Sequence, residues 1–171
     1  MAEYSRFFDS TPGDKRSYSA AEFAEFMRTF YSTGVISGGE KLKVTRNPAT
    51  MSVAVAPGMA MLEGHWYLND AAFPLQVTAA DATYPRIDRV VLRLDLTLNV
   101  RKINLKVLKG IPAAVPQPPA LTRNENIYDL SLAQLSIVAN ATTVSTVTDE
   151  RVDASVCGIS QGLYTVDLSG F

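Results

Sequence analysis

The chain has 171 residues, a length that suits one ordinary domain and is short for two. Hydrophobic residues make up 47% of it and charged residues 19%, a composition that excludes a disordered chain and supplies ample material for a core. Its formal net charge of −1 lacks the basic excess of most nucleic-acid-binding proteins, so we exclude nucleic acid as a main partner.

The chain shows no pattern of secretion or membrane insertion. No stretch approaches the roughly 18 consecutive apolar residues of a membrane span, and Glu3, Arg6 and Asp9 interrupt the start, where a signal peptide would be apolar. Cys157 is the single cysteine, which excludes an intrachain disulfide. We therefore expect a protein that folds in the cytoplasm and has no membrane partner.

The clearest local pattern lies between residues 18 and 34. Ser19 and Glu22 have the spacing of a capping box, which begins a helix. Apolar residues then recur at i, i+3, i+4, i+7 and i+8, which places one set on a single face: Phe23, Phe26, Met27, Phe30 and Tyr31. Gly34 is the kind of residue that ends a helix in a left-handed conformation. The pattern predicts a helix over residues 20–33.

This aromatic face has two interpretations. It packs against the rest of the same domain, which is the commoner outcome, or it docks onto another subunit, because exposed apolar stripes usually mark interfaces. The sequence leaves both open. The same five residues, from Phe23 to Tyr31, are therefore our candidate protein interface.

After Gly34 the apolar periodicity changes to two, which is typical of strands. Glu63-Gly64 has the composition of a tight hairpin turn, and Pro57-Gly58 breaks the chain. The pattern predicts short strands at residues 42–44, 52–56, 59–62, 65–68 and 73–77.

The strongest strand pattern runs over residues 86–96. Apolar side chains of Val90, Leu92 and Leu94 alternate with charged ones, which predicts one apolar face and one largely charged face. A hairpin loop at 97–101 would lead to a partner strand at 102–109. Lys102 and Lys106 of that strand would then lie opposite the charged face, forming pairs of mixed sign with Arg89, Arg93 and Asp95.

The last third of the chain is less regular. Residues 110–120 contain four prolines, which remove ladder donors, so we predict an extended connector that crosses the surface of the domain. Residues 127–138 fit a helix or a bulged strand, and we predict the strand; a final strand is predicted at 144–147. The whole pattern indicates a mainly β chain: a single antiparallel β-sandwich domain over residues 1–171 with one N-terminal α-helix.

Residues suited to catalysis are few. His65 is the only histidine, and one histidine with one cysteine cannot build a typical transition-metal site. Cys157 could act as a nucleophile with His65 as its base, but the neighbouring sequence does not support such a pair. A free cysteine is usually a small buried apolar residue. We therefore predict no catalytic residue, no metal site and no cofactor, and a protein that is not an enzyme.

The densest charged cluster lies at residues 149–153. Asp149, Glu150 and Asp153 lack the glycine-centred ligand pattern of a calcium loop. We expect these groups to be solvated, or to form ion pairs with basic residues of the strong strand: Arg86, Arg89 and Arg93.

Aromatic residues with a polar edge suit stacking on sugar rings, although packing on a sheet explains them equally well. They are Trp66, Tyr67, Tyr84, Tyr128 and Tyr164. Trp66 and Tyr67 are our candidates for a saccharide contact.

Several segments, taken in order, resemble one family. They are Phe7-Phe8-Asp9-Ser10 with Gly13-Asp14 and Arg16-Ser17-Tyr18, the predicted helix with Gly34-Val35, Met51-Ser52-Val53 with Pro57-Gly58-Met59-Ala60, and the run from Arg86 to Asp95. Further along come Gly110-Ile111-Pro112-Ala113, Leu121-Thr122-Arg123, Tyr128-Asp129-Leu130, Leu132-Ala133-Gln134, Thr148-Asp149-Glu150-Arg151 and Cys157-Gly158. Over residues 4–160 the chain resembles the N-terminal module of tail and baseplate proteins of siphophages from Gram-positive, Bacillus-type hosts.

The nearest structural relatives that this resemblance suggests are lactococcal phage receptor-binding proteins, whose shoulder domain is a β-sandwich. It implies a structural protein of the virion that contacts other tail or baseplate proteins, commonly as a homotrimer, and it carries over no catalytic residues. Larger members of the family continue past the Cys-Gly region into a fibre or receptor-binding head. Because this chain stops at Phe171, an attachment or scaffold role is expected. The alternative is a carbohydrate-binding module for host cell-wall polysaccharide.

Overall fold

A computed structural model describes residue 3 and residues 5–163, and within them one short helix precedes ten strands. The helix α1 spans Ala20–Arg28. The strands are β1 (Gly34–Ile36), β2 (Val44–Arg46), β3 (Ser52–Val55), β4 (Gly58–Leu62), β5 (His65–Asn69), β6 (Phe73–Gln76), β7 (Arg86–Asp95), β8 (Lys102–Leu108), β9 (Ile127–Ile137) and β10 (Thr146–Asp149).

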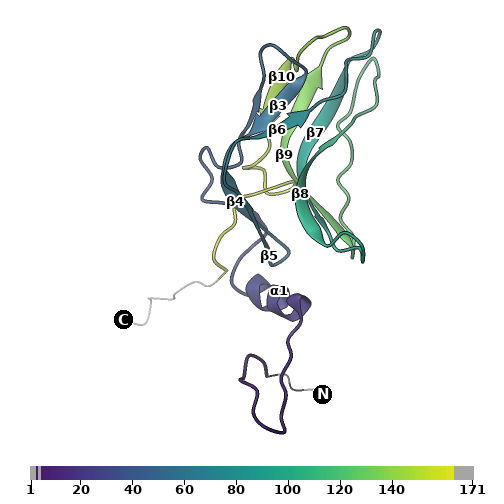
Figure 1. Ribbon diagram of the computed structural model, residues 1–171. Coiled ribbons are helices and arrows are strands. Elements are labelled where there is room, and N and C mark those ends of the chain that lie inside the picture. Colours follow the sequence, from purple (N-terminus) through teal and green to yellow (C-terminus); the bar gives the residue numbers. More distant parts are fainter. Residues whose placement is uncertain (1–2, 4, 164–171) are drawn as a thin grey trace.

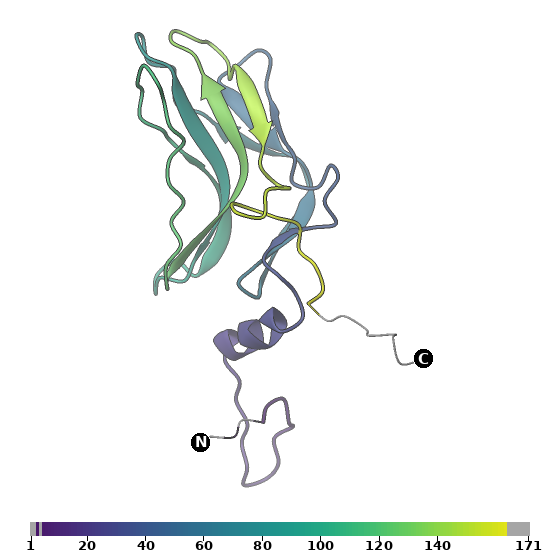
Figure 2. The same cartoon turned by 180° about the vertical axis from the view of Figure 1, so that it is seen from behind.

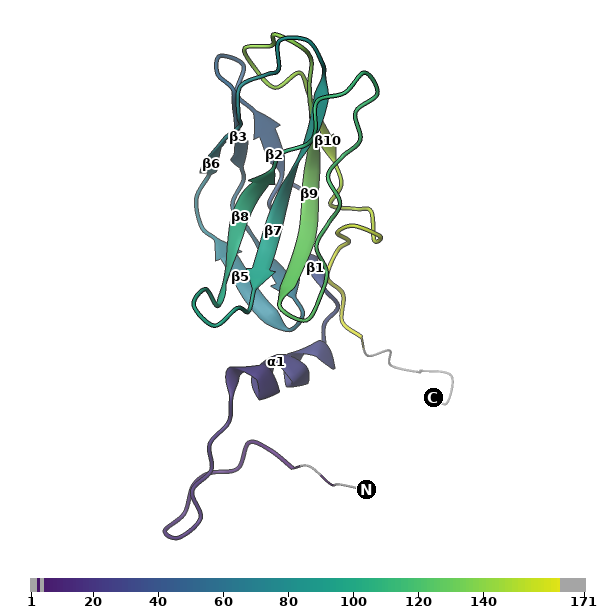
Figure 3. The ribbon, with the colours of Figure 1, turned by 90° about the vertical axis from the view of Figure 1, so that its right-hand side faces the viewer.

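The strands form two layers. A four-stranded sheet, in the order β10-β9-β7-β8, makes one layer, and two three-stranded sheets, β1-β4-β5 and β2-β3-β6, lie behind it (Figure 3). All paired strands of these sheets are antiparallel. The predicted mainly β, antiparallel sandwich with one N-terminal helix is therefore confirmed.

The core fills the space between the layers. Alternate residues of β7, including Val90 and Leu92, are fully buried there, and so are Leu130 and Leu135 of β9. The opposite layer supplies residues from β1 to β4 to the same cluster. No residue of α1 belongs to it. The helix is thus an appendage at one end of the sandwich, with the N-terminal segment beyond it (Figures 1 and 2).

The ambiguous segment at 127–138 is a strand with one irregularity. Val90 of β7 lies opposite Ala133, but the next residue, Val91, lies opposite Ser131, so Leu132 is an extra residue in β9. A bulge of this kind shifts the alternation of faces by one residue. This shift explains why apolar side chains fall on even positions before Leu132 and on odd positions after it.

The helix ends earlier than the sequence predicts, so the boundary at residue 33 is wrong. The Thr29 hydroxyl donates to the Phe26 carbonyl at 2.7 Å, and the chain then becomes extended. The amide of Ser32 donates to the carbonyl of Gln161 at 2.9 Å, and Tyr31 forms a bridge with Gly162. Pairing with this distant segment overrides the helical apolar pattern, as tertiary context often does.

Gly34 also has a different role from the predicted one, because it begins β1 and does not cap the helix. A Cβ on Gly34 would lie 2.6 Å from the amide nitrogen of Ser160. The glycine is therefore required by the close approach of the segment that follows Gly158.

Two other strand boundaries are wrong. The strand predicted at 42–44 is β2, at Val44–Arg46, because Leu42 has a φ of 56° and lies in a turn. The strand predicted at 144–147 is β10, at Thr146–Asp149. Leu42 and Val144 are fully buried, so their apolar character serves the core and not a strand.

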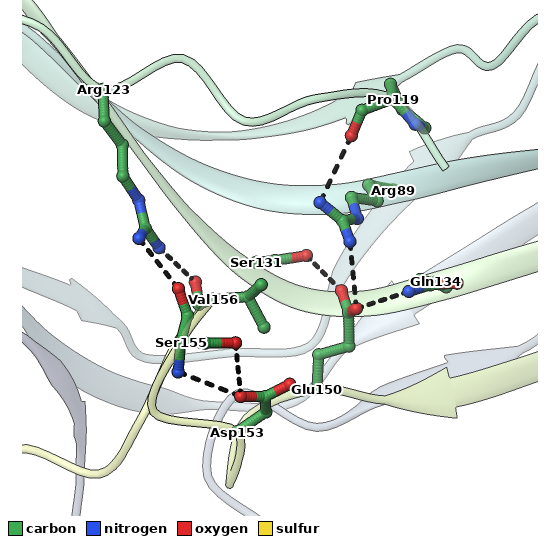
Figure 4. A network of polar contacts seen from close by, with 9 residues as sticks. All are labelled: Arg89, Pro119, Arg123, Ser131, Gln134, Glu150, Asp153, Ser155 and Val156. Atoms are coloured by element: carbon green, nitrogen blue, oxygen red, sulfur yellow. Dashed lines mark hydrogen bonds and ion pairs between the residues drawn. The ribbon is translucent and has the colours of Figure 1, made fainter. Parts of the chain in front are cut away.

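The outer face of β7 is covered, and this corrects the expected pairing across the β7–β8 hairpin. Of the three charged residues expected to face lysines, Arg89 lies opposite Leu108, Arg93 lies opposite Asn104, and only Asp95 lies opposite a lysine, Lys102. Arg93 instead donates two hydrogen bonds to the buried Asp129 of β9, at 2.7 and 2.8 Å. Arg89 bonds to Glu150 and to the carbonyl of Pro119 (Figure 4).

The Arg89 contact with Pro119 fixes the predicted proline-rich connector, which has no strand and crosses the face of the four-stranded sheet. The buried carboxylate of Asp88 accepts a hydrogen bond from the amide of Gly110 at 2.8 Å. Asp88 in turn pairs with the buried Arg86, whose guanidinium also donates to the carbonyls of Thr78 and Ala79. The charges of this strand therefore hold the fold together and do not form a solvated face.

Candidate interaction surface

The helix α1 begins as predicted. The Ser19 hydroxyl accepts a hydrogen bond from the amide of Glu22, and the Glu22 carboxylate accepts one from the amide of Ser19 at 2.7 Å. These hydrogen bonds hold the pKa of Glu22 below its ordinary value. The capping box therefore fixes where the helix starts and which residues share each of its faces.

The face of α1 that touches the sandwich is small. Ala24 is the only buried residue of the helix, and its backbone lies against Gly64 in the turn between β4 and β5. Glu63 and Gly64 both have positive φ, of 47° and 75°, as a tight hairpin turn requires. Arg28 and Thr33 add polar contacts to the Glu63 carboxylate at 3.3 and 3.1 Å.

The aromatic side chains of α1 and of the turn after it lie largely outside this contact. Phe23 is 54% exposed, and Phe26 and Phe30 are also exposed. Phe26 meets the ring of Phe30 edge-on, with their centroids 4.9 Å apart. The interpretation of this face as core packing within the sandwich is therefore wrong for the three phenylalanines.

Residues before the helix extend this surface. Phe7 has a φ of 69° and lies against the rings of Phe26, Phe23 and Tyr18, with centroid distances of 4.9, 6.4 and 5.3 Å. Arg6 bonds to the carboxylates of Glu22 and Glu25 at 3.1 and 2.7 Å. We call this set the aromatic cluster: Phe7, Tyr18, Phe23, Phe26 and Phe30.

The five candidate interface residues do not share one surface. Phe23, Phe26 and Phe30 belong to the aromatic cluster; Phe23 also borders the space between α1 and the sandwich, where Met27 is half-buried. Tyr31 lies beyond the end of the helix, in the extended segment that pairs with Gly162. The sequence missed Phe7 because a helical period cannot place a residue outside the helix.

A cavity of about 630 Å³ lies between α1, the β4–β5 hairpin and the β7–β8 hairpin. We call it the apolar groove. Except for His65, Arg101 and Lys102, all its lining residues are apolar or glycine. Phe23, Met27, Met61, Trp66, Leu94 and Ile103 supply its main apolar surface. The sequence did not predict this groove, because its three walls are far apart along the chain.

The two saccharide candidates, Trp66 and Tyr67, lie on opposite faces of β5, as neighbours in a strand must. Trp66 is 59% exposed and lines the apolar groove. Tyr67 packs against the core, and its burial raises the pKa of its hydroxyl. The structure therefore brings only Trp66 to a surface. Tyr164 lies outside the described residues.

The charged cluster at 149–153 is largely structural (Figure 4). Glu150 is buried and bonds to Arg89 at 3.2 Å and to Ser131 and Gln134 at 2.5 Å, which confirms one of the expected ion pairs. Asp149 instead pairs with Arg151. The Asp153 carboxylate accepts bonds from the amide and hydroxyl of Ser155.

Cys157 is buried, and this burial raises the pKa of its thiol to about 12. At neutral pH the group is therefore protonated and a weak nucleophile. The His65 ring contacts the carbonyl of Glu63 through Nδ1 at 3.0 Å.

The part of the chain that the structure describes contains neither a metal-ligand group nor a helix that could span a membrane. Residues 5–163 contain no group of three or more histidine, cysteine or acidic side chains arranged to hold a metal ion. Across the same residues, no helix has the length and apolar character needed to cross a membrane.

Searches with family models, against curated proteins and against solved structures found no match for this chain. Function must therefore be argued from the residues of the chain itself. Two surfaces at the helix end of the sandwich, the aromatic cluster and the apolar groove, are the strongest candidates.

Proposed function

We propose that this protein is a structural component of a phage tail or baseplate, which acts as an attachment or scaffold module in the host-adsorption apparatus. The observation that carries the proposal is the exposed aromatic cluster at one end of a rigid sandwich. Contiguous exposed apolar surface is rare on soluble proteins that work alone, and it typically marks a protein interface.

The internal polar contacts support a holding role. Arg86, Arg89 and Arg93 all lie in the segment that resembles tail proteins, and each is used to fix another part of the fold. Their partners are buried carboxylates or backbone carbonyls. The charged groups therefore stabilise one rigid shape, which suits a protein that positions its neighbours and performs no catalysis.

The partners that we propose are neighbouring tail or baseplate proteins and other copies of this chain, assembled as a trimer. Aromatic residues are enriched among those that contribute most to binding free energy at protein interfaces. The protein would act in the virion after folding in the cytoplasm of the host.

The decisive experiment is mass spectrometry of virions made by the phage that encodes the chain, with wild-type protein or the variant Phe26→Asp. We expect the wild-type protein at a fixed number of copies per particle and the variant to be depleted, because a buried unpaired carboxylate opposes docking. Leu98→Asp, at an exposed loop position of the β7–β8 hairpin, is the matched control and should be incorporated normally.

Two outcomes would contradict this proposal. Absence of the wild-type protein from purified particles would exclude a structural role in the virion. If Phe26→Asp is incorporated normally and lowers only the thermal stability, the aromatic cluster serves the fold and not an interface.

The exposed indole of Trp66 favours one alternative, a carbohydrate-binding module for host cell-wall polysaccharide. In that case the protein would retain isolated wall polysaccharide and lose it in Trp66→Ala. Tyr67→Phe is a useful control, because this ring faces the core and the change removes only a hydroxyl. Retention by wild type that is unchanged in Trp66→Ala would exclude this site.

A further inference from the structure

We propose that the apolar groove receives Phe8 and Asp9 from the N-terminal arm of a second copy of this chain. The arm comprises residues 5–17 and projects beyond α1, away from the sandwich, in all three views (Figures 1–3). The inference does not depend on the phage role, because it can be tested on the purified protein alone.

The arm holds a fixed shape that presents these two residues. The amide of Phe8 donates to the Tyr18 hydroxyl at 2.9 Å, and Thr11 and Asp14 exchange two backbone hydrogen bonds at 3.0 Å. Phe7 is held in the aromatic cluster, but the ring of Phe8 contacts no other aromatic ring among the described residues and is 57% exposed. The arm therefore offers an aromatic anchor whose conformation is already ordered.

The charge of Asp9 is complementary to that of the groove. The carboxylate of Asp9 makes no ion pair within residues 5–163, unlike that of Asp14, which pairs with Arg16. Arg101 and Lys102, at the mouth of the groove, likewise make no ion pair in that part of the chain. No acidic residue lines the groove. An apolar side chain with an adjacent carboxylate matches this lining better than a neutral sugar, which would need more hydrogen-bonding groups.

The arm of a given copy is fixed against its own helix. Arg6 pairs with Glu25, and Phe7 packs on Phe26 and on Phe23, whose ring also borders the groove that Ala24 and Met27 line. A second copy is therefore the natural donor of Phe8. Each copy carries one arm and one groove, which are different surfaces, so the contact is head-to-tail; such a contact forms a ring where its rotation closes and an open filament where it does not.

Sedimentation velocity of the purified chain over a range of concentrations tests this contact. We expect wild type to self-associate and Phe8→Ala to associate about tenfold more weakly or worse, as is typical when an aromatic anchor is lost.

Asp9→Lys and the double variant Arg101→Glu/Lys102→Glu should each weaken association. Combining Asp9→Lys with Arg101→Glu/Lys102→Glu should restore it, because the charges are then reversed on both sides. Lys109→Glu reverses one charge just beyond the other end of β8; it is the control for a charge reversal outside the groove and should behave as wild type.

Three outcomes would overturn the proposal. Wild type that stays monomeric at the highest soluble concentration has no such contact. Self-association that survives Phe8→Ala and the charge reversals but is lost in Phe26→Asp belongs to the aromatic cluster alone. Finally, a monomer that binds wall polysaccharide through Arg101 and Lys102 would assign the groove to a saccharide.

Discussion

Gly64 lies directly against the backbone of Ala24, and a Cβ at position 64 would come within 2.0 Å of the Ala24 carbonyl oxygen. This backbone contact joins the hairpin turn to α1 at Ala24, the only buried residue of the helix. The position of the aromatic cluster therefore depends on the absence of a side chain at Gly64.

We predict that Gly64→Ala detaches the helix without unfolding the sandwich, since no helix residue belongs to the core cluster. Hydrogen exchange should show lost protection of the amides of residues 23–28. The matched control is Gly39→Ala. Gly39 also has a positive φ, of 58°, but its Cβ would meet nothing within 4 Å. Equal protection of the helix amides in both variants would mean that the Ala24 contact does not hold the helix against the sandwich.

A second prediction concerns the central strand. Leu92 is fully buried and is flanked by strands on both sides, so Leu92→Ala should lower the free energy of unfolding by about 2–5 kcal/mol. Leu98→Ala makes the same chemical change at a side chain that is 79% exposed and should alter it by less than about 0.5 kcal/mol. Urea unfolding measures both. Equal losses of unfolding free energy in the two variants would show that the Leu92 side chain does not face the core.

Local sequence patterns predicted most of this fold because they reflect interactions between residues that are close together in the sequence. Alternating apolar residues such as Val90, Leu92 and Leu94 lie on the same face only if the segment is a strand. Ser19 and Glu22 accept hydrogen bonds from backbone amides that are left unpaired at the start of any helix. The error at the end of the helix has a long-range cause. Residues 29–33 continue the helical pattern, but pairing with residues 161–163 draws them into an extended path, and nothing near them in the sequence indicates that partner.

The candidate surface was predicted in part for the same reason. Helical spacing placed Phe23, Phe26 and Phe30 together correctly, but whether that face is covered depends on how the helix attaches. A single small contact at Ala24 leaves the phenylalanines exposed. The apolar groove needs three segments, from α1, β5 and the β7–β8 hairpin, and so could not be derived from any one of them.

A third prediction concerns the buried ion pair of Arg89 and Glu150. Glu150→Gln would leave the Arg89 guanidinium buried without its charge partner, and its Nε already has no hydrogen-bond partner in the described structure. We expect a loss of about 3–5 kcal/mol in unfolding free energy. Glu40→Gln breaks the exposed pair with Lys43 and should cost at most about 1 kcal/mol. Similar losses in the two variants would show that the buried network does not stabilise the fold.

The last prediction is a dependence of stability on alkaline pH that arises from Cys157. Burial raises the pKa of this thiol to about 12, from an ordinary value of 9.0. Below pH 9 the thiol is protonated in both states. As the pH rises from 9 towards 12, the unfolded chain releases this proton first, so the folded state loses stability. The variant Cys157→Ala has no thiol and should therefore lack this contribution to the loss of stability at high pH.

The measurement is the change in melting temperature between about pH 8 and pH 11, pH values chosen on either side of the ordinary thiol pKa. Tyrosines and lysines titrate in both proteins, so the comparison isolates the thiol. We expect a steeper fall for wild type than for Cys157→Ala. A thiol-specific alkylating reagent gives an independent check, because native Cys157 should react far more slowly than the same residue in urea. Parallel pH profiles together with rapid native alkylation would mean that Cys157 is accessible and that its burial does not control its ionisation.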